Sequence, residues 1–509
     1  MNLFETIFKN PLDSTAIIFS DRRITFGELC EETLKTSRVM SSLGIARGDR
    51  VALLLNDSPE FVEAFIAICS MGAITVPINM ALRLDEQRSI LNNSGASCAL
   101  MEEDLCNSLL TDASEKLRQL REVVVVERNG NSTTRKTLKQ LKAETSSLEL
   151  PDFPEPGDDE PAFILYTSGS TGEPKGAVHR QSDILHVNAT YCHEVLQLTR
   201  EDRLFSSSRL PFAYGLGNSF TFPLLNGATS ILCRDKPTPQ VIANVLKETK
   251  PTIFFGVPVV YNLLLELHRS GTPIDCSSMR FCVSAGEALP AHLGEEWEKE
   301  FGVQVLDAIG STEMLHMFMS NHLNEVRYGS SGKLLQGYEA RLLDENEEPV
   351  DGNEGNLWIK GQSAAIGYWE RPDVTSQTFV NGWVRTGDLY RRDDEGYWFH
   401  MGRSDDCFKS SGQWVSPVEV EGVLIKRERV RSVAVVEDFD SDGLPCACAF
   451  VVCNDVESSF AAVEEDLHDL AAQSLPRFKR PKRYVFVNEF PYTATGKVQR
   501  FKLRQELRK

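Results

Sequence analysis

Eleven residues in the first half of the chain, YTSGSTGEPKG from Tyr166 to Gly176, combine hydroxyls, glycines and one lysine. Glycines let a backbone turn tightly and approach a ligand, and exposed N–H groups and hydroxyls can face phosphate oxygens. Lys175 adds a positive charge. The apolar run 162–166 before the segment predicts a buried strand that ends in it. The segment therefore predicts a loop that binds a polyphosphate.

Two other interpretations of this segment are weaker. A flexible Ser/Gly linker rarely follows an apolar strand, and it rarely places a lysine directly after a proline. A Walker-type loop requires Gly-Lys followed by Ser or Thr at the start of a helix. Here the order is Lys175-Gly176 and no hydroxyl follows directly, so that motif is absent.

Two polar stretches follow predicted strands further along the chain. DAIGSTE (307–313) comes after the apolar run 303–306, and open α/β sheets bind ligands at the carboxyl ends of their strands. Glu313 is suited to holding Mg²⁺, which prefers oxygen ligands, although a surface turn with an exposed acid explains the position equally well. SAGEALP (284–290) follows another strand, and its small residues could let a flat ring lie against the backbone.

Two more stretches lie in the last third of the chain. WVRTGD (383–388) ends in a carboxylate that could accept hydrogen bonds from two ribose hydroxyls, although an isolated Thr-Gly-Asp is more often a turn. PYTATGK (491–497) places a lysine after a glycine turn near the end of an acidic chain. By itself that lysine would indicate no function.

The order of the apolar runs predicts an α/β fold. Ser58 and Pro59 can start a helix between the strands 51–55 and 73–78, and strand–helix–strand is the unit of a parallel sheet. A further helix is expected with Ser182 as its cap. After about residue 330, short strands and glycines predict a β-rich layer, and the tail is long enough for a small α+β domain. Further strands are expected at 98–101, 122–126, 229–232, 252–256, 280–284 and 303–306.

Composition excludes several classes of function. The 509 residues are too many for one core, so two or more domains are expected. The net charge of −19 argues against sequence-independent binding to nucleic acid or to an anionic membrane. Twelve cysteines without a Cys-x-x-Cys spacing predict reduced thiols and a cytoplasmic protein. No signal peptide, membrane span or zinc spacing is recognisable in the sequence.

Taken together and in this order, YTSGSTGEPKG, DAIGSTE, WVRTGD, GRSDD (402–406) and PYTATGK resemble the adenylate-forming superfamily. That superfamily contains acyl-CoA synthetases, carrier-protein adenylation domains and luciferases, and the resemblance covers nearly the whole chain. Residues 210–229 and 284–321 most resemble benzoate-CoA ligases and their aryl relatives. The implied fold has a large N-terminal domain of α/β subdomains plus a β-barrel, residues 1–403. A small mobile α+β C-terminal domain, residues 404–509, would follow with its hinge at Asp405.

The resemblance also implies a two-step reaction. A carboxylate attacks the α-phosphate of ATP and forms an acyl-adenylate and pyrophosphate, and the thiol of CoA then displaces AMP. A small aromatic or alicyclic acid, ATP, Mg²⁺ and CoA are the implied ligands. The alternative is a stand-alone adenylation enzyme that loads an aryl or alicyclic acid onto the phosphopantetheine of an acyl carrier protein. A homodimer stays open.

The family's site residues carry over onto matching positions. Lys497 would bridge the carboxylate and the α-phosphate, Thr312 would contact the α-phosphate, and Glu313 would hold Mg²⁺. Asp388, assisted by Arg403, would bind the ribose hydroxyls. The remaining nucleotide contacts would come from Thr167, Ser168, Gly169, Ser170, Thr171, Gly172 and Lys175 at the phosphates, and from Glu287, Ala288, Asp307 and Ile309 at the adenine. Many relatives carry an aromatic residue in place of Ile309, so stacking on adenine becomes aliphatic contact here.

The same resemblance implies an acyl pocket lined by Phe212, Ala213, Tyr214, Gly215, Gly286, Ile309, Gly310, His316 and Met317. A flat slot of small residues with a tyrosine wall suits a small aryl ring. His316 could orient the substrate or be a structural histidine. Pro211 replaces a phenylalanine that benzoate-type members usually have, so benzoate is the best single candidate and substituted, heteroaryl or alicyclic acids stay open. After rotation about the hinge, the thiol tunnel would be lined by Lys409, Gly412 and Trp414.

Overall fold

The computed structural model describes residues 2–110, 117, 119–127, 135–168, 174–440, 442–454, 460–492 and 498–507. The chain divides into two compact units: unit 1 comprises Met1–Glu339 and Ile359–Val384, and unit 2 comprises Ala340–Trp358 and Arg385–Lys509. The division falls inside three strands: β16 (Tyr338–Leu343), β17 (Glu354–Gly361) and β20 (Trp383–Arg392). The expected boundary after residue 403 stays a prediction.

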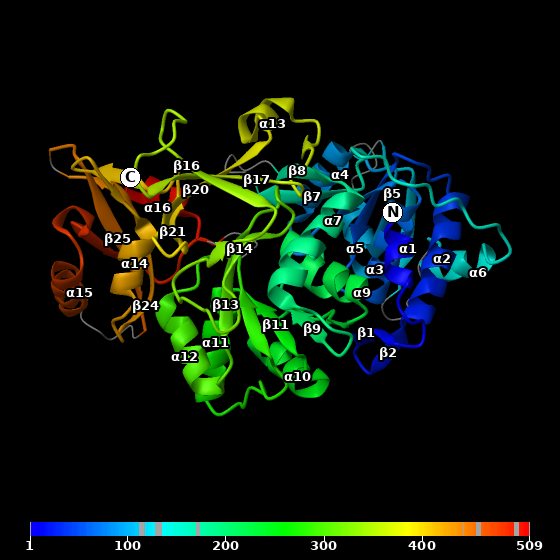
Figure 1. Ribbon diagram of the computed structural model, residues 1–509, viewed down its shortest axis with the longest axis horizontal. Coiled ribbons are helices and arrows are strands. Elements are labelled where there is room, and N and C mark those ends of the chain that lie inside the picture. The colour runs from blue at the N-terminus through cyan, green and yellow to red at the C-terminus, as the bar shows by residue number, and fades with distance from the viewer. Residues whose placement is uncertain are drawn as a thin grey trace. The chain divides into compact units, whose positions relative to one another are not determined.

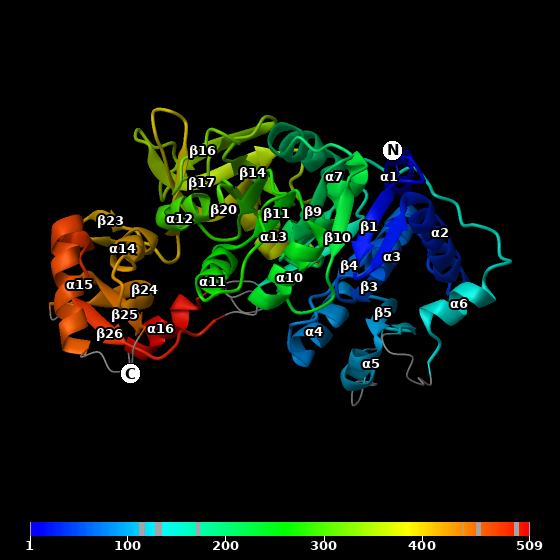
Figure 2. The same ribbon diagram turned by 90° about the horizontal axis from the view of Figure 1, so that it is seen from below.

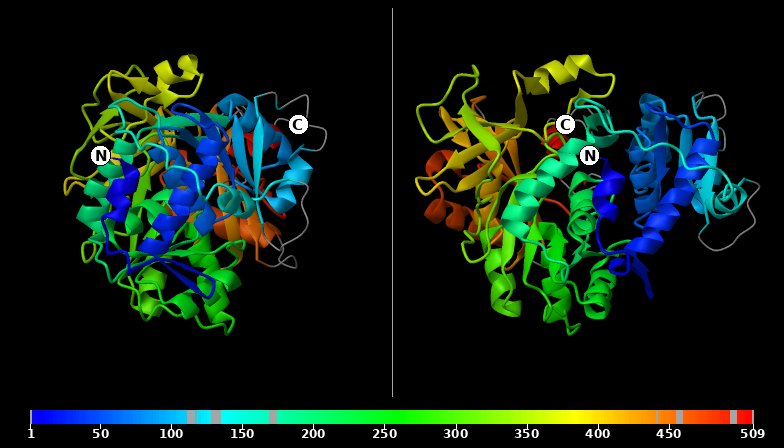
Figure 3. Two further views of the ribbon diagram at one scale, coloured as in Figure 1. Left: turned by 90° about the vertical axis from the view of Figure 1, so that its right-hand side faces the viewer. Right: turned by 45° about the vertical axis from the view of Figure 1, so that its right-hand side comes forward.

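The first sheet of unit 1 has seven strands in the order β18-β8-β7-β4-β3-β5-β6. The strands from β7 to β6 are parallel, and β8 and β18 are antiparallel additions at one edge. The left view of Figure 3 shows the blue strands of this sheet side by side. The bounds are β3 (Arg50–Leu54), β4 (Ile74–Pro77), β5 (Cys98–Glu102), β6 (Glu122–Val126), β7 (Phe163–Ser168), β8 (Pro174–His179) and β18 (Gly367–Tyr368).

Local signals set the helices of this sheet. Helix α3 (Pro59–Ser70) begins where the Ser58 side chain accepts a hydrogen bond from the Phe61 N–H, with proline at the first position. The predicted strand–helix–strand unit is therefore confirmed. The other helices before β7 are α1 (Leu3–Phe8), α2 (Phe26–Ser42), α4 (Leu84–Ser94), α5 (Glu103–Leu110) and α6 (Leu138–Glu144).

The second sheet of unit 1 has nine strands in the order β15-β14-β13-β12-β11-β9-β10-β1-β2. Helices α10 (Pro239–Thr249), α11 (Pro258–Arg269) and α12 (Ala291–Phe301) lie together along it (Figure 1), and the buried Tyr261 of α11 and Trp297 of α12 pack in its core. The bounds are β1 (Thr15–Phe19), β2 (Arg22–Thr25), β9 (Arg203–Ser206), β10 (Thr229–Leu232), β11 (Ile253–Gly256), β12 (Phe281–Ser284), β13 (Val305–Gly310), β14 (Met317–Ser320) and β15 (Lys333–Leu334).

Two helical segments of unit 1 change their winding along their length. Helix α7 (Gln181–Val187) continues as the π-helix η1 (Asn188–Leu196), and α8 (Ala213–Leu216) continues through the π-helix η2 (Gly217–Thr221) into α9 (Phe222–Asn226). The prediction that Ser182 caps α7 is wrong. The helix begins at Gln181, because the Asp183 carboxylate accepts a hydrogen bond from the backbone N–H of Arg180, the N-cap residue, at 3.1 Å.

Unit 2 contains a three-stranded sheet, β24-β25-β26, with α14, α15 and α16 packed around it (Figure 2). The predicted β-rich layer is a five-stranded sheet in which β16, β17, β20 and β19 follow one another and β21 pairs with β20. In unit 1, the remaining bounds are α13 (Pro372–Thr378) and β19 (Phe379–Val380). In unit 2 they are β21 (Trp398–Arg403), β22 (Phe408–Ser410), β23 (Gln413–Val415), α14 (Pro417–Leu424), β24 (Val430–Phe439), β25 (Pro445–Cys453), α15 (Phe460–Ser474), a 3₁₀ turn (Arg477–Lys479), β26 (Arg483–Phe486) and α16 (Arg500–Leu507).

The α/β fold class is confirmed by this arrangement of parallel sheets and covering helices. Among the residues that the structure describes, no helix combines the length and the apolar character needed to cross a bilayer.

Candidate active site

The loop between β13 and β14 carries Thr312 and Glu313 at the carboxyl end of β13. Oε1 of Glu313 accepts a hydrogen bond from the Tyr368 hydroxyl at 2.6 Å, and the Glu313 carbonyl accepts one from the Ala365 N–H at 2.8 Å. The carboxylate is therefore held in a defined position. Within the described part of the chain, His, Cys, Asp and Glu side chains form no ready-made metal cluster. One oriented carboxylate fits Mg²⁺ in the form it usually takes beside substrate phosphates.

A buried histidine contacts the backbone of this loop. Nε2 of His179 lies 2.8 Å from the carbonyl oxygen of Thr312, and its Nδ1 lies 2.9 Å from Oδ2 of Asp183. Both side chains are fully buried. This pair was not among the residues predicted from the sequence. The available signal was a histidine that ends an apolar strand and an acid four residues later on a helix.

The phosphate segment forms the hairpin of β7 and β8, in which Thr167 pairs with Lys175. Nζ of Lys175 lies over the ring of Tyr368, 5.6 Å from its centroid. Gly169, Ser170, Thr171, Gly172 and Lys497 lie outside the described residues, as does the side chain of Ser168. Their roles at the phosphates, and those of Thr167 and Lys175, stay predictions.

The predicted adenine segments are neighbours in the second sheet, because Ser284 of β12 pairs with Asp307 of β13. Asp307 is buried, and burial raises the pKa of its carboxyl well above the ordinary value, against the lowering effect of the Leu289 N–H. That N–H donates to Oδ2 at 3.3 Å, whereas Oδ1 has no hydrogen-bond partner among the described residues. A buried oxygen without a partner costs free energy, so a ligand that donates to it would be stabilised here.

The other predicted adenine residues lie around Asp307. Ile309 follows in β13 and pairs with Met319 of β14. Glu287 and Ala288 lie in the loop between β12 and α12, directly before Leu289. Their contact with adenine stays a prediction.

His316 lies at the centre of a cluster of rings. Its centroid is 4.6 Å from that of Phe222, 5.1 Å from that of Tyr191 and 5.9 Å from that of Tyr214. Burial lowers the pKa of His316 to about 3, so the ring is neutral. Neither ring nitrogen makes a hydrogen bond of ordinary geometry to a described residue. The arrangement is a buried aromatic wall with one neutral polar ring, which suits a flat uncharged group.

Backbone contacts hold the predicted acyl residues close to this wall. Phe212 is the N-cap of α8, which contains Ala213, Tyr214 and Gly215. Gly310 pairs with Met317, and a Cβ at Gly310 would lie 2.3 Å from the His316 carbonyl oxygen. Gly286 has φ of 90°, which favours glycine. The structure therefore gathers Tyr214, Gly310, His316 and Met317.

Sequence reasoning missed three residues of this wall: Tyr191, Gly217 and Phe222. A Cβ at Gly217 would lie 2.5 Å from Cδ2 of His316, so only glycine leaves room for the ring. Phe222 follows Tyr214 by eight residues, which places both on the same helical face. That spacing was the signal in the sequence.

In unit 2, Asp388 and Arg403 pair across β20 and β21. Oδ1 of Asp388 lies 3.2 Å from Nη1 of Arg403 and 3.3 Å from Nε2 of His400. Burial alone would raise the pKa of Asp388, but His400 and Arg403 together hold it below the ordinary value. Gly387 has φ of 73°, and a Cβ there would lie 2.6 Å from Nη2 of Arg403. The result is an ionised carboxylate with an adjacent guanidinium. Its binding to ribose stays a prediction.

The predicted hinge and thiol residues also lie in unit 2. The Asp405 carbonyl accepts a hydrogen bond from Arg504 at 3.2 Å. Lys409 and Trp414 pair in the hairpin of β22 and β23, with Nζ of Lys409 4.9 Å from the centroid of Trp414, and Gly412 forms the turn with φ of 76°. The hinge and tunnel roles stay predictions.

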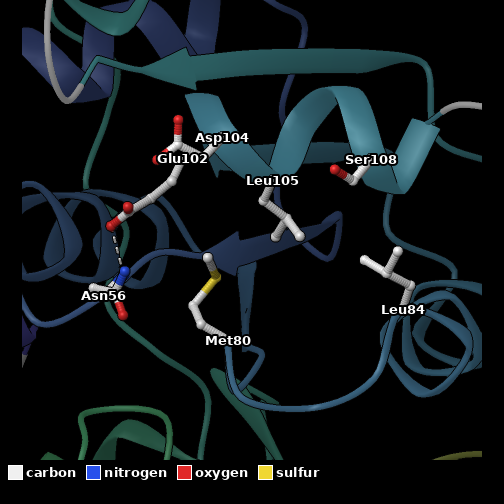
Figure 4. A pocket seen from close by; sticks show the side chains of 7 residues that line it. All are labelled: Asn56, Met80, Leu84, Glu102, Asp104, Leu105 and Ser108. Atoms are coloured by element: carbon white, nitrogen blue, oxygen red, sulfur yellow. Dashed lines mark hydrogen bonds between the residues drawn. The ribbon is translucent and has the colours of Figure 1, made fainter. Parts of the chain in front are cut away.

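A separate open hollow of about 340 Å³ lies beyond the carboxyl ends of β3, β4 and β5 in unit 1. Figure 4 shows Glu102 beside Asn56, whose backbone N–H donates to the Glu102 carboxylate at 3.0 Å. The described residues that line it include none of the predicted site residues; they are Asn56, Met80, Leu84, Glu102, Asp104, Leu105 and Ser108.

Comparison with known protein families identifies the family of this chain. Residues 3–369 match the AMP-binding enzyme family, and residues 419–497 match the AMP-binding enzyme C-terminal domain. The chain belongs to the AMP-binding enzyme family. The family predicted from the sequence motifs is therefore confirmed.

Two curated members of the family are similar over most of their length. The benzoate–CoA ligase of Thauera aromatica is 40% identical over 92% of this chain and 88% of its own. The 4-hydroxybenzoate–CoA/benzoate–CoA ligase of Rhodopseudomonas palustris is 34% identical over 96% of this chain and 90% of its own.

Two solved structures are similar in fold and in sequence. An anthranilate CoA ligase in complex with anthranoyl-AMP has a TM-score of 0.91 and 34% identity, covering 100% of this chain and 97% of that one. A benzoate CoA ligase from Burkholderia xenovorans has a TM-score of 0.87 and 35% identity, covering 99% of this chain and 100% of that one.

Proposed function

We propose that the chain is an ATP-dependent ligase that joins a small aryl carboxylic acid to CoA through an acyl-adenylate. The observation that carries the proposal is the arrangement of the loop between β13 and β14. It places Thr312 and the oriented carboxylate of Glu313 on one part of the loop, and His316 with its aromatic wall a few residues later. In this proposal, a phosphate-facing group and an aryl-facing group share one short segment.

The first step joins two anions. A carboxylate oxygen of the acid attacks the α-phosphorus of ATP, and the bond from that phosphorus to the bridging oxygen of pyrophosphate breaks. Catalysis therefore consists mainly of charge neutralisation and positioning. In this account Thr312 contacts the α-phosphate, Lys175 and the phosphate loop hold the terminal phosphates, and Lys497 bridges the two reactants. Mg²⁺, held by Glu313, would supply further neutralisation of the phosphate charge when bound.

The second step releases AMP. The thiol of CoA attacks the carbonyl carbon of the acyl-adenylate, and the bond from that carbon to the AMP oxygen breaks. Asp388 and Arg403 keep the nucleotide in place through its ribose. Rotation about Asp405 would withdraw Lys497 and bring Lys409, Gly412 and Trp414 to the thiol.

Benzoate is the proposed acid, because the wall around His316 is aromatic, buried and uncharged. Ring-substituted, heteroaryl and alicyclic acids are the other candidates. CoA is the favoured acceptor because the similar proteins described above are CoA ligases, and loading of a carrier protein is the less favoured alternative. A homodimer and a cytoplasmic location stay predictions.

A panel of acids tests the proposal. Pyrophosphate release and CoA thioesters are measured with benzoate, hydroxybenzoates, aminobenzoates, cyclohexanecarboxylate and a long-chain fatty acid. We expect release and a thioester with at least one aryl acid and neither with the fatty acid. Pyrophosphate release without a CoA thioester, together with acylation of a phosphopantetheinylated carrier protein, would instead establish the alternative.

A further inference from the structure

Tyr368 is held against the strand that follows the phosphate loop. It lies in β18, where it pairs antiparallel with Ala177 of β8, and the next residue's N–H donates to the Gly176 carbonyl at 2.7 Å. Its own N–H donates to Oγ1 of Thr375 at 2.9 Å. The residue is only 8% exposed. Its backbone is therefore held between β8 and α13 by hydrogen bonds to both elements.

The side chain of Tyr368 contacts two predicted ligand-binding groups at once. Its hydroxyl donates to Oε1 of Glu313 at 2.6 Å, the length of a strong hydrogen bond to a carboxylate. The face of its ring lies under Nζ of Lys175, which is 5.6 Å from the centroid, within the range of a cation–π contact. One aromatic side chain thus links the lysine of the phosphate loop to the carboxylate that would hold the divalent cation.

We propose that Tyr368 is a positioning residue that orients the Glu313 carboxylate for a divalent cation and holds Lys175 beside the phosphates. The inference rests on the proposed function, in which Glu313 holds Mg²⁺ beside ATP. It deepens that function by assigning a role to a residue that none of the predicted site motifs contains.

Tyr368 should affect cation binding because a carboxylate without its hydrogen-bond donor can adopt more side-chain orientations. A glutamate whose orientation is fixed by a hydrogen bond presents its other oxygen in a defined direction, and a free one must lose rotamer entropy when the cation binds. Removing an outer hydrogen-bond partner of a metal ligand typically lowers metal affinity or activity about tenfold to hundredfold. Loss of the ring would in addition release Lys175.

Two substitutions separate these effects. Tyr368→Phe removes the hydroxyl and keeps the ring under Lys175, whereas Tyr368→Leu removes both. Tyr338→Phe is the matched control, because the Tyr338 hydroxyl is also buried and lies 3.0 Å from Oγ of Ser363 rather than from a predicted ligand. Ser363 donates to the Met314 carbonyl, so the control perturbs the same neighbourhood.

Binding of Mn²⁺ is measured by electron paramagnetic resonance on the full chain with a non-hydrolysable ATP analogue, and the Mg²⁺ midpoint of pyrophosphate release is measured with benzoate. We expect Tyr368→Phe to raise both cation midpoints about tenfold to hundredfold and Tyr338→Phe to leave them unchanged. Thioester formation from supplied benzoyl-adenylate and CoA should be unaffected by Tyr368→Phe. Tyr368→Leu should in addition weaken binding of the ATP analogue at saturating cation.

Several results would overturn the inference. Unchanged cation midpoints in Tyr368→Phe would show that Tyr368 does not orient Glu313. An equal fall in the rates of both half-reactions, without a shift in the cation midpoints, would show that the residue is merely structural. Identical behaviour of the phenylalanine and leucine variants would remove the role toward Lys175. If the unmodified chain activates no aryl acid, the proposed function fails, but the Mn²⁺ titration still decides the role of Tyr368.

Discussion

The Nε2 atom of His179 lies 2.8 Å from the carbonyl oxygen of Thr312, which joins the end of β8 to the loop after β13. On its other side, Nδ1 lies 2.9 Å from Oδ2 of Asp183, whose Oδ1 also accepts a hydrogen bond from Nε of Arg180. The ring therefore lies between two oxygen atoms of other segments, the Thr312 carbonyl and the Asp183 carboxylate. This buried network fixes Thr312 relative to the strand that leaves the phosphate loop.

His179→Ala should destabilise unit 1 and slow adenylation. The substitution leaves the Thr312 carbonyl without its side-chain partner and removes one partner of the Asp183 carboxylate, which keeps its hydrogen bonds from Arg180. An unsatisfied buried group costs about 1–3 kcal/mol. Denaturant unfolding and pyrophosphate release measure the two effects. The control is His322→Ala, which removes a half-exposed ring 3.5 Å from Glu194. Equal effects of the two substitutions would contradict the assigned role.

Asp388→Asn should weaken ATP binding. The wild-type carboxylate is ionised at neutral pH, because His400 and Arg403 hold its pKa below the ordinary value despite burial. Hydrogen bonds to charged groups contribute about 1.5–3 kcal/mol, so the KM for ATP should rise at least about tenfold. Asp394→Asn, at an exposed position of the same hairpin, should leave the KM unchanged. A normal KM in Asp388→Asn would refute the ribose assignment.

The stability of the protein should fall at acidic pH because of His316. Its pKa is about 3 in the folded protein because of burial, below the ordinary value of 6.5. As pH falls below 6.5, the unfolded chain binds a proton that the folded chain does not, so stability is lost between pH 6.5 and pH 3. The loss approaches about 1.4 kcal/mol per pH unit.

Urea unfolding of the parent and of His316→Asn at pH 7 and pH 5 measures this contribution. The parent should lose more stability than the variant over that interval, by about 2 kcal/mol. The comparison cancels the groups that titrate in both proteins. If both proteins lose the same stability, the folded-state pKa is not depressed.

Lys497→Ala should separate the two half-reactions. Removing the bridging charge should slow pyrophosphate release at least about hundredfold, in line with the loss of one group that stabilises transition-state charge. Thioester formation from supplied benzoyl-adenylate should continue. Lys502→Ala on α16 is the control and should affect neither step. An equal fall in both steps would argue against a role confined to adenylation.

Asp405→Pro tests the predicted hinge. Proline fixes φ near −65° and restricts the backbone rotation that a moving C-terminal domain requires. We expect a slower thiol step with adenylation preserved, measured as the ratio of the two half-reaction rates. An unchanged ratio would show that rotation at this residue is not required.

Local signals were sufficient to predict much of the fold. The apolar runs around Ser58 and Pro59 gave the strand–helix–strand unit, and the helix begins where Ser58 caps it. The polar stretches 284–290 and 307–313 were each expected after a strand, but β13 (Val305–Gly310) extends through Asp307 and Ile309. That extension depends on the pairing of β13 with β12 and β14 and not on neighbouring residues alone.

The contacts that orient the site depend instead on pairing between distant segments. Tyr368 meets Glu313 across 55 residues only because β18 adds to the edge of β8. His179 meets Thr312 across 133 residues because two sheets bring their ends together. No local pattern in the sequence encodes these two long-range contacts. The spacing of His179 and Asp183 could have indicated that pair, but not its contact with Thr312.

The fate of the carboxylate oxygens distinguishes activation through an acyl-adenylate from other routes to the thioester. Benzoate labelled with heavy oxygen in both carboxylate positions is incubated with the protein, ATP, Mg²⁺ and CoA, and the products are analysed by mass spectrometry. Attack of the carboxylate on the α-phosphate predicts AMP with one heavy oxygen and benzoyl-CoA with the other. AMP without the label, or ADP as the nucleotide product, would contradict activation through an acyl-adenylate.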